Sequence, residues 1–394
     1  MFFIGLKRTL FILVIVFIAL VSLLRYGYVE SAAFPDRTLM PLLASTELEV
    51  VADLVLPPGN IAVADNADVY FTFHPEAKPS INLARLVNGQ AQAFPSTEWQ
   101  PGGSEPLAFN EVLSIRIDNQ QRLWALDNGK HGLERARLLA FDLAQGELVD
   151  SFTFSRAEFA LGSHANDFQI SKDGRYIIIS DASLLAKNPA LIIYDTQQKT
   201  ARRVLERHES VLAGPFEPVV QGKKMTLFGI FTVNPGVDGL VLDASDEFLY
   251  YASVSANQLY RVPFSALIND ELSATALAGE VETVAEKTMT DGMVMDSAGN
   301  LYLSDIENSA IVRINPQGQL DTLLKSVSIR WPDGFSNGPN NYVYFTASSL
   351  HEVLGKSAEH IAAQGPYQIF RFKLPSSDLT SSDLTSSDST SGDI

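Results

Sequence analysis

The stretch TDGMVMDSAGNLYLSDIENSAIVRINPQGQLDTLLK, residues 290–325, alternates short apolar runs with polar turns. The runs are rich in leucine, aromatic and β-branched residues, and the turns carry Asp, Asn, Ser and Gly, a pattern typical of strands joined by tight turns. Four such strands in succession predict one small antiparallel sheet. An aspartate, Asp291, stands at its start. What that residue does there is the main question that this stretch raises.

The same pattern occurs five more times along the chain. Each copy has a short apolar strand, a polar turn, and a strand of aromatic and β-branched residues. The copies are NIAVADNADVYFTFHP from Asn60, LSIRIDNQQRLWALDNG from Leu113, NDFQISKDGRYIIISDA from Asn166, DGLVLDASDEFLYYASV from Asp238 and DGFSNGPNNYVYFTAS from Asp333. Third strands follow most copies, and the spacing of roughly 40 to 70 residues matches the repeat length of β-propeller blades.

These repeats predict an all-β fold, a six-bladed β-propeller with four-stranded antiparallel blades over residues 45–374. The segment ELEVVADLVL, residues 47–56, precedes the first blade. We expect it to form the outer strand of the last blade, because this closes the ring and covers an open sheet edge. A β-sandwich or two separate β domains would also contain such strands, but six copies in phase favour the propeller.

Composition excludes several classes of function. The chain has 394 residues and a formal net charge of −17, which argues against nucleic acid or an anionic membrane surface as a partner. It contains no cysteine, so disulfides, thiolate catalysis and thiolate metal sites are ruled out. The excess of carboxylates suits a cationic or metal-bound ligand, although most acidic proteins are merely soluble. Nothing in the composition predicts an oligomeric state.

Both ends of the chain differ from the repeats. Lys7 and Arg8 precede an uncharged apolar run over residues 9–24, and small residues follow at Ser31 and Ala33. Residues 1–33 are therefore expected to be a cleaved signal peptide or an anchor in the inner membrane, the membrane contact being limited to this segment. Either alternative predicts an extracytoplasmic protein, secreted or periplasmic. Residues 375–394 repeat Ser-Ser-Asp and predict a disordered tail.

Acidic or amide residues recur at the start of the first strand of several blades. They are Asn166, Asp238, Asp291 and Asp333. One interpretation is structural: Asp-Gly makes a tight turn in which the glycine takes a positive φ and the aspartate caps backbone N–H groups. The other is functional: the inner strands of a propeller line one channel, so these side chains converge at its mouth. Convergence is expected under either interpretation.

At these motifs the chain resembles the yellow/major royal jelly protein family. The resemblance rests on GVDGLVLDASDEFLYYASVSANQLYRVP, on TDGMVMDSAGNLYLSDIENSAIVRINP and on WPDGF, with RLWALDNG, LLAFDL, NDFQIS and ALIIYDT in the same order before them. It implies a secreted six-bladed propeller with a ligand site at one end of the channel. Insect members of the family include dopachrome-converting enzymes and salivary proteins that bind biogenic amines. The absence of cysteine, the leader and the tail make this chain similar to a bacterial representative.

A more distant resemblance is to gluconolactonase and regucalcin propellers, which hold a divalent cation. It implies a metal site at Asn166, Asp238 and Asp291 for Ca²⁺ or a similar hard cation. The glutamate that these propellers carry in the first blade has no counterpart, because Gly59 and Asn60 stand in its place. Glu111 is a weak substitute, since its position is out of phase with the other blades.

Two classes of function remain open. In the first, an acidic channel mouth binds a small molecule such as a protonated amine or a catechol-derived compound, through Asn166, Asp238 and Asp333 with the aromatic residues Phe168 and Trp331 nearby.

In the second, the same site is catalytic. It would be a metal-dependent lactonase-like hydrolase or an aminochrome isomerase, with Asp291 or His164 as the base. Sequence motifs of serine hydrolases, nucleotide-binding loops and zinc peptidases are missing. The insertion at residues 205–235 would form a lid or a surface loop.

Overall fold

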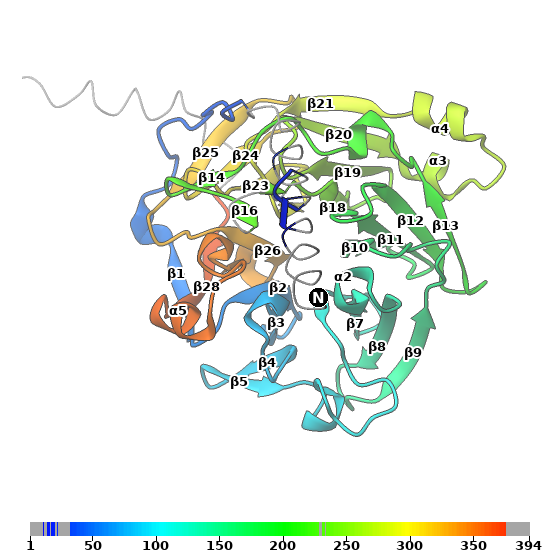
Figure 1. Ribbon diagram of the computed structural model, residues 1–394, viewed down its shortest axis with the longest axis horizontal. Coiled ribbons are helices and arrows are strands. Elements are labelled where there is room, and N and C mark those ends of the chain that lie inside the picture. Colours follow the sequence, from blue (N-terminus) through cyan, green and yellow to red (C-terminus); the bar gives the residue numbers. More distant parts are fainter. Residues whose placement is uncertain are drawn as a thin grey trace, which may run out of the picture.

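Six four-stranded antiparallel sheets are arranged in a ring around a central channel in the computed structural model (Figure 1). The structure describes residues 32–375 except 228–230 and 233, together with residues 11, 14, 15, 17–19 and 22 of the apolar leader. The innermost strands of neighbouring blades contact one another all the way round, from β2 through β6, β10, β18, β22 and β26 back to β2. The predicted six-bladed propeller is confirmed.

The strands of each blade follow one another from the channel outward. Blades 1 to 3 consist of β2 (Pro58–Val63), β3 (Val69–Phe73), β4 (Leu83–Val87) and β5 (Gln90–Ala93); β6 (Val112–Ile117), β7 (Arg122–Asp127), β8 (Arg137–Asp142) and β9 (Leu148–Thr153); and β10 (Ala165–Ile170), β11 (Tyr176–Asp181), β12 (Ala190–Asp195) and β13 (Thr200–Val204).

Blades 4 to 6 have the same arrangement. They consist of β18 (Val237–Leu242), β19 (Phe248–Ser253), β20 (Gln258–Pro263) and β21 (Glu282–Glu286); β22 (Met293–Met295), β23 (Leu301–Asp305), β24 (Ala310–Ile314) and β25 (Leu320–Lys325); and β26 (Pro332–Asn337), β27 (Tyr342–Ala347), β28 (Tyr367–Lys373) and β1 (Glu49–Leu54).

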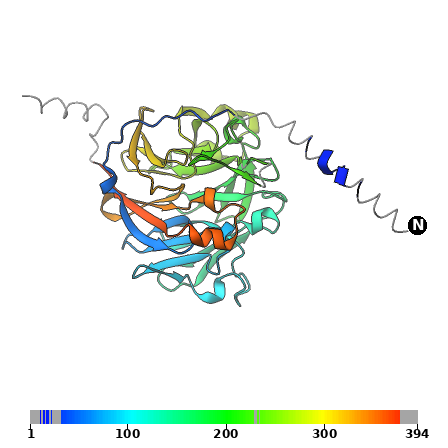
Figure 2. The ribbon, with the colours of Figure 1, turned by 60° about the vertical axis from the view of Figure 1, so that its left-hand side comes forward.

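The N-terminal strand closes the ring. β1 pairs antiparallel with β28 and so becomes the outer strand of the sixth blade, as predicted (Figure 2). An ion pair between Arg371 and Glu49, with Nη2 and Oε2 at 2.7 Å, reinforces the pairing. The edge of β28 is thereby hydrogen-bonded to β1 instead of being left open to other chains.

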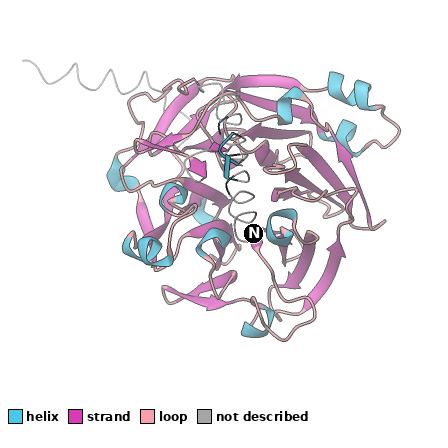
Figure 3. Ribbon diagram, in the orientation of Figure 1, coloured by secondary structure: helices cyan, strands magenta, loops and turns pink. Residues whose placement is uncertain are grey.

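Apolar side chains fill the spaces between adjacent sheets. The middle strands β7, β11, β23 and β27 are almost wholly buried because both faces of each blade are covered by a neighbouring blade. Helical segments are short and occupy connecting loops (Figure 3): α2 (Gly129–Gly132), α3 (Phe264–Ile268), α4 (Ala274–Gly279), α5 (Ala358–Ala363), η1 (Ser45–Glu47), η2 (Pro75–Ala77), η3 (Thr97–Trp99), η4 (Glu209–Val211), η5 (Pro339–Asn341) and η6 (Leu350–Glu352).

Two small hairpins lie along the chain between blades 3 and 4. They are β14 (Val219–Val220) with β15 (Lys223–Lys224), and β16 (Thr226–Leu227) with β17 (Phe231–Thr232). The predicted leader over residues 1–33 lies largely outside the described residues, as does the predicted tail over 376–394. Within the described ranges, no helix has both the length and the apolar character needed to cross a bilayer.

Candidate functional site

The innermost strands share an irregularity at their channel-mouth ends. In β2, β6, β10, β18 and β26 the pairing register with the next strand shifts there, as in a β-bulge. In β10 the shift falls between Ala165 and Phe168, so Asn166 and Asp167 both lie in the bulge and both line the channel mouth. Asp238 and Asp333 are the second residues of β18 and β26, and Asp291 lies two residues before β22.

The glycine of each Asp-Gly pair is needed for close approach between blades. Gly239, Gly292 and Gly334 do not have the positive φ expected for a tight turn, which corrects that expectation. A Cβ atom would lie 2.5 Å from the Asp291 carbonyl oxygen at Gly239, 1.8 Å from the Asp333 carbonyl oxygen at Gly292, and 2.6 Å from the Asn60 Cα at Gly334. Any side chain would therefore push neighbouring blades apart.

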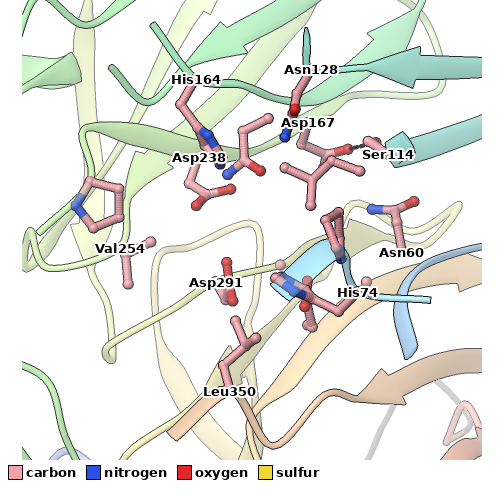
Figure 4. Close-up of a pocket in the computed structure, with 18 of the residues that line it drawn as sticks. Asn60, His74, Ser114, Asn128, His164, Asp167, Asp238, Val254, Asp291 and Leu350 are labelled. Atoms are coloured by element: carbon pink, nitrogen blue, oxygen red, sulfur yellow. Dashed lines mark hydrogen bonds between the residues drawn. The ribbon is translucent and has the colours of Figure 1, made fainter. Parts of the chain in front are cut away.

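One cavity of about 120 Å³ gathers most of the predicted site residues at this end of the channel (Figure 4). Its lining includes His164, Asn166, Asp238, Asp291, Trp331 and Asp333. Phe168 is a correction: it is fully buried in the apolar core against residues such as Trp124 and Phe154. The bulge takes up two polar residues, so the strand alternation resumes with Phe168 pointing into the core.

Three carboxyl groups from blades 4 to 6 form the acidic wall of the cavity: Asp238, Asp291 and Asp333. Burial, followed by the neighbouring Asp291 charge, raises the pKa values of Asp238 and Asp333 well above their ordinary value. Burial also raises the pKa of Asp291 to about 6, although a hydrogen bond from Trp331 opposes the rise. Asp238 and Asp291 are close enough for a side-chain hydrogen bond, so one proton can be shared between them.

Trp331 holds Asp291 in place. Its Nε1 donates a hydrogen bond to Asp291 Oδ2 at 2.6 Å, and its ring lies nearly parallel to that of His351. Trp331 has a φ of 54°, a left-handed conformation that is costly for a bulky residue and that persists where the surroundings enforce it.

Lys287 lies behind the acidic wall. It is fully buried, and its Nζ donates to the carbonyl oxygens of Val254 at 3.1 Å and Thr288 at 3.0 Å. Burial lowers the pKa of Lys287 to about 7, while the nearby carboxylates of Asp305, then Asp238 and Asp291, oppose that decrease. The ammonium donates to two backbone carbonyls, so it reduces the negative potential of the acidic wall through space and not through a hydrogen bond to the aspartates.

A fourth acidic residue, Asp167, is already neutralised. Arg116 Nη2 donates to both of its carboxylate oxygens, at 2.7 and 2.8 Å, and Ser114 donates a further hydrogen bond to Oδ1. Arg116 also donates to Asn60 Oδ1 at 2.6 Å. The amide oxygen of Asn60 is thus already bonded to a guanidinium.

Several polar groups of this cavity are already paired within the protein. On the side of blades 1 to 3, the guanidinium of Arg116 already donates to Asn60 Oδ1. The indole of Trp331 donates to one Asp291 oxygen. Over the described part of the chain, no group of three or more His, Asp or Glu side chains has a geometry that would hold a metal ion. If a divalent cation bound, Asn166, Asp238 and Asp291 would be its available oxygen donors.

A second wall of the cavity is made of histidine and glutamate. His74 and Glu76 come from the loop after β3, His131 from the loop after β7, and His164 from the residue before β10. Glu111 lies next to this group, with its Oε2 3.9 Å from His131 Nε2. Sequence reasoning found only His164, because the others are far apart in the chain.

The sequence nevertheless contains a pattern that could have identified this wall: the position of its residues after the second strand of each blade. Loops that follow the second strand of successive blades meet at the same mouth, for the geometric reason that brings the innermost strands together. His74, His131, Leu184, Val254 and Leu350 all line the cavity from such loops.

The insertion between blades 3 and 4 reaches the cavity. Pro218 and Pro235 line it, and the backbone N–H of Val219 donates to Glu307 Oε1 of blade 5 at 2.7 Å. On its other side, Phe216 packs edge-on against Phe34, with ring centroids 4.8 Å apart. The insertion therefore borders the mouth and is tied to the segment that precedes the first blade.

Comparison with known proteins gives a consistent family assignment. The family described as "Major royal jelly protein" matches residues 111–353. Major royal jelly protein 7 of Apis mellifera is 25% identical over 229 residues, which is 56% of this chain and 50% of that protein. Major royal jelly protein 3 of Apis mellifera is 25% identical over 251 residues, 60% of this chain and 44% of that protein. The chain spans about half the length of the curated relatives that it matches.

Solved structures show the same fold at low sequence identity. A luciferin-regenerating enzyme superposes with a TM-score of 0.54 and 11% identity, covering 83% of this chain and 95% of the other. A gluconolactonase from Xanthomonas campestris superposes with a TM-score of 0.51 and 12% identity, covering 82% and 89%. At these identities the likeness establishes the propeller architecture alone.

Proposed function

The chain belongs to the major royal jelly protein family, and from that premise we propose that it is an exported propeller whose cavity binds a small protonated amine. The observation that carries the proposal is the acidic wall. Asp238, Asp291 and Asp333 line one cavity at the channel mouth, where Asp238 is buried and the other two are partly buried. The lysine behind them is occupied by backbone carbonyls.

An ammonium group would relieve the electrostatic cost of this wall. Buried carboxylates that repel one another either take up protons or attract a cation. An ammonium donates up to three hydrogen bonds. It would form close ion pairs with the carboxylates of Asp291 and its neighbour Asp238. The ring of Trp331 at the same mouth adds a surface suited to a cation.

The size of the cavity limits the rest of the ligand. About 120 Å³ is comparable with the engineered cavity of roughly 150 Å³ that holds benzene in another protein. A single ring with short substituents fits that volume, so an aromatic amine or catechol-derived amine is the ligand class that we favour.

Calorimetric titration of the full chain with dopamine and serotonin tests the proposal. Binding is expected to release protons, because the ammonium favours the ionised carboxyl groups, and the heat should therefore depend on the buffer. Asp291→Asn should weaken binding by about tenfold or more. The matched control is Asp150→Asn, which removes a carboxylate paired with Lys199 on the outer strand β9. The proposal fails if neither amine binds, or if the two variants behave alike.

A second candidate function is favoured by the histidines that line the same cavity as the carboxyl groups. An aminochrome isomerase needs a base on one side of the ring and a charge-stabilising group on the other. His164 and Asp291 line the same cavity from different blades. A metal-dependent lactonase remains the weaker alternative, and a rise in thermal midpoint with Ca²⁺, absent in Asp238→Asn, would support it over amine binding.

A further inference from the structure

We propose that Glu76, His131 and His164 form a proton relay that ends at the cavity, with His164 as the group that exchanges a proton with a bound ligand. The inference rests on the proposed function only in that a ligand must occupy the cavity. Glu76 and His131 act through His164 and are positioning residues.

The two imidazole rings meet at their Nδ1 atoms. These atoms are 3.3 Å apart, whereas the ring centroids are 5.1 Å apart and the planes differ by only 10°. The nitrogens are thus closer than the ring centres and lie within hydrogen-bonding distance, with the donor set by the tautomers. On its other side His131 directs Nε2 to Glu76 Oε1 at 3.1 Å.

The far end of the relay opens into the cavity. His164 is one of the lining residues, and Figure 4 shows it pointing into the same space as Asp238 and Asp291. Across the described ranges no hydrogen bond occupies its Nε2. Its backbone N–H donates to Asp181 Oδ1 at 2.9 Å, which fixes the residue at the start of β10.

The hydrogen-bond chain fixes the tautomers in each protonation state. When His131 is neutral, its Nε2–H donates to Glu76, so its Nδ1 is an acceptor and His164 must carry its proton on Nδ1. The lone pair of His164 Nε2 then faces the cavity and is free to accept a proton. His164 in this state is a base.

Proton uptake from the ligand reverses the arrangement without leaving a charge on His164. A ligand O–H, N–H or C–H bond breaks, its electron pair stays with the ligand, and the proton bonds to His164 Nε2. At the same time the Nδ1 proton of His164 moves to His131 Nδ1. His131 becomes an imidazolium beside the Glu76 carboxylate, and reversal of the same steps returns the proton.

Electrostatics agree with this direction of transfer. The hydrogen bond to Glu76 raises the pKa of His131, so the relay stores the proton on His131.

The remaining titratable neighbours favour a cation on His131. Besides Glu76, it faces Glu111, whose Oε2 is buried without a hydrogen-bond partner in the described structure and whose pKa burial raises. His74 stays neutral, because burial lowers its pKa to about 4, and its Nδ1 accepts from the Glu76 N–H.

His131 has a φ of 53°, a strained conformation for a residue other than glycine. The loop thus holds the ring in place at a cost in backbone energy.

Nuclear magnetic resonance of the full chain with ¹⁵N-labelled histidine tests the relay without any ligand. The chain has six histidines, so His131→Gln and His164→Gln assign the two signals. We expect His131 to titrate at a pH above 6.5. We expect His164 to remain neutral and to move its proton from Nδ1 to Nε2 as His131 becomes charged.

Glu76→Gln should lower the titration midpoint of His131 by about 1 pH unit and move the tautomer change of His164 with it. His360→Gln, which alters a half-exposed histidine outside the cavity, should leave both signals unchanged. The relay is refuted if His164 keeps one tautomer while His131 titrates, or if His164 itself becomes charged. Loss of dopamine binding bears on the amine proposal alone, since the tautomer measurement needs no ligand.

Discussion

Replacing Asp291 with asparagine should stabilise the fold at pH 7.5 and leave its stability almost unchanged at pH 3.5. Burial raises the pKa of this carboxyl from 3.8 to about 6 in the folded chain. Between those two values the folded state binds more protons than the unfolded state, so stability is lost as the pH rises. At about 1.36 kcal/mol per pH unit, the difference corresponds to about 3 kcal/mol above pH 6.

The assay is unfolding by guanidinium chloride at both pH values, which gives the free energy of unfolding of each chain. Asparagine preserves the shape of the side chain, and its carbonyl oxygen can still accept the hydrogen bond from Trp331. The reasoning is refuted if Asp291→Asn is less stable than the native chain at pH 7.5, or if the difference between the chains does not depend on pH.

Asp127→Asn is the matched control. Asp127 is more deeply buried than Asp291, and it pairs with Arg137 and accepts backbone hydrogen bonds from Asn110 at 2.8 Å and Glu111 at 3.1 Å. The same chemical change there leaves a buried guanidinium without its partner, and should destabilise the fold by about 3 to 5 kcal/mol at pH 7.5. Opposite signs in the two variants would separate a carboxylate that stabilises the fold from one that costs stability.

Three further outcomes are expected. Trp331→Phe removes the donor that stabilises ionised Asp291, so the pH midpoint of dopamine affinity, measured by calorimetry, should rise by about 1 unit or more. Gly292→Ala forces a Cβ against the next blade and should lower the free energy of unfolding by about 3 kcal/mol, whereas Gly279→Ala, which meets nothing within 4 Å, should not lower it. Phe34→Ala should speed proteolysis of the insertion, detected by mass spectrometry, because the buried ring that packs against it is lost.

The blade architecture could be predicted because it depends on local patterning that recurs. The run from Asp291 to Lys325 contains all four strands of blade 5, and polar residues mark the turns between them. Closure of the ring by the N-terminal strand could be predicted because the edge of the last blade would otherwise be left unpaired. The convergence of Asp238, Asp291 and Asp333 followed in turn from the ring, since equivalent positions in the blades must meet at the axis.

Details that depend on contacts between blades were not predictable in this way. Closeness in sequence to Asn166 suggested Phe168 as a contact at the mouth, but a bulge in β10 accommodates Asn166 and Asp167 together and Phe168 packs in the core. The requirement for glycine at position 292 comes from the carbonyl of Asp333, which is on another blade and lies 1.8 Å from where a Cβ would be. A single repeat contains no trace of its neighbour.

The wall of histidines was missed for a related reason. His74 and His131 follow the second strands of blades 1 and 2, and no fixed spacing links them in the chain. Their meeting depends on the path of two irregular loops, one of which includes the left-handed residue His131. Aligning the six repeats on their second strands would have placed both residues at the mouth, although not at hydrogen-bonding distance.

The pairing of β1 with β28 also orders the last steps of folding. Glu49 in β1 and Arg371 in β28 are separated by 322 positions, so their contact has among the largest sequence separations in the molecule. Contacts of that kind form slowly, because much of the intervening chain must first become compact. During synthesis β1 emerges first and must wait, unpaired, until nearly every other strand has been made. We infer that the sixth sheet is the last to assemble. Until then β1 is unpaired and is the strand most exposed to binding by a chaperone.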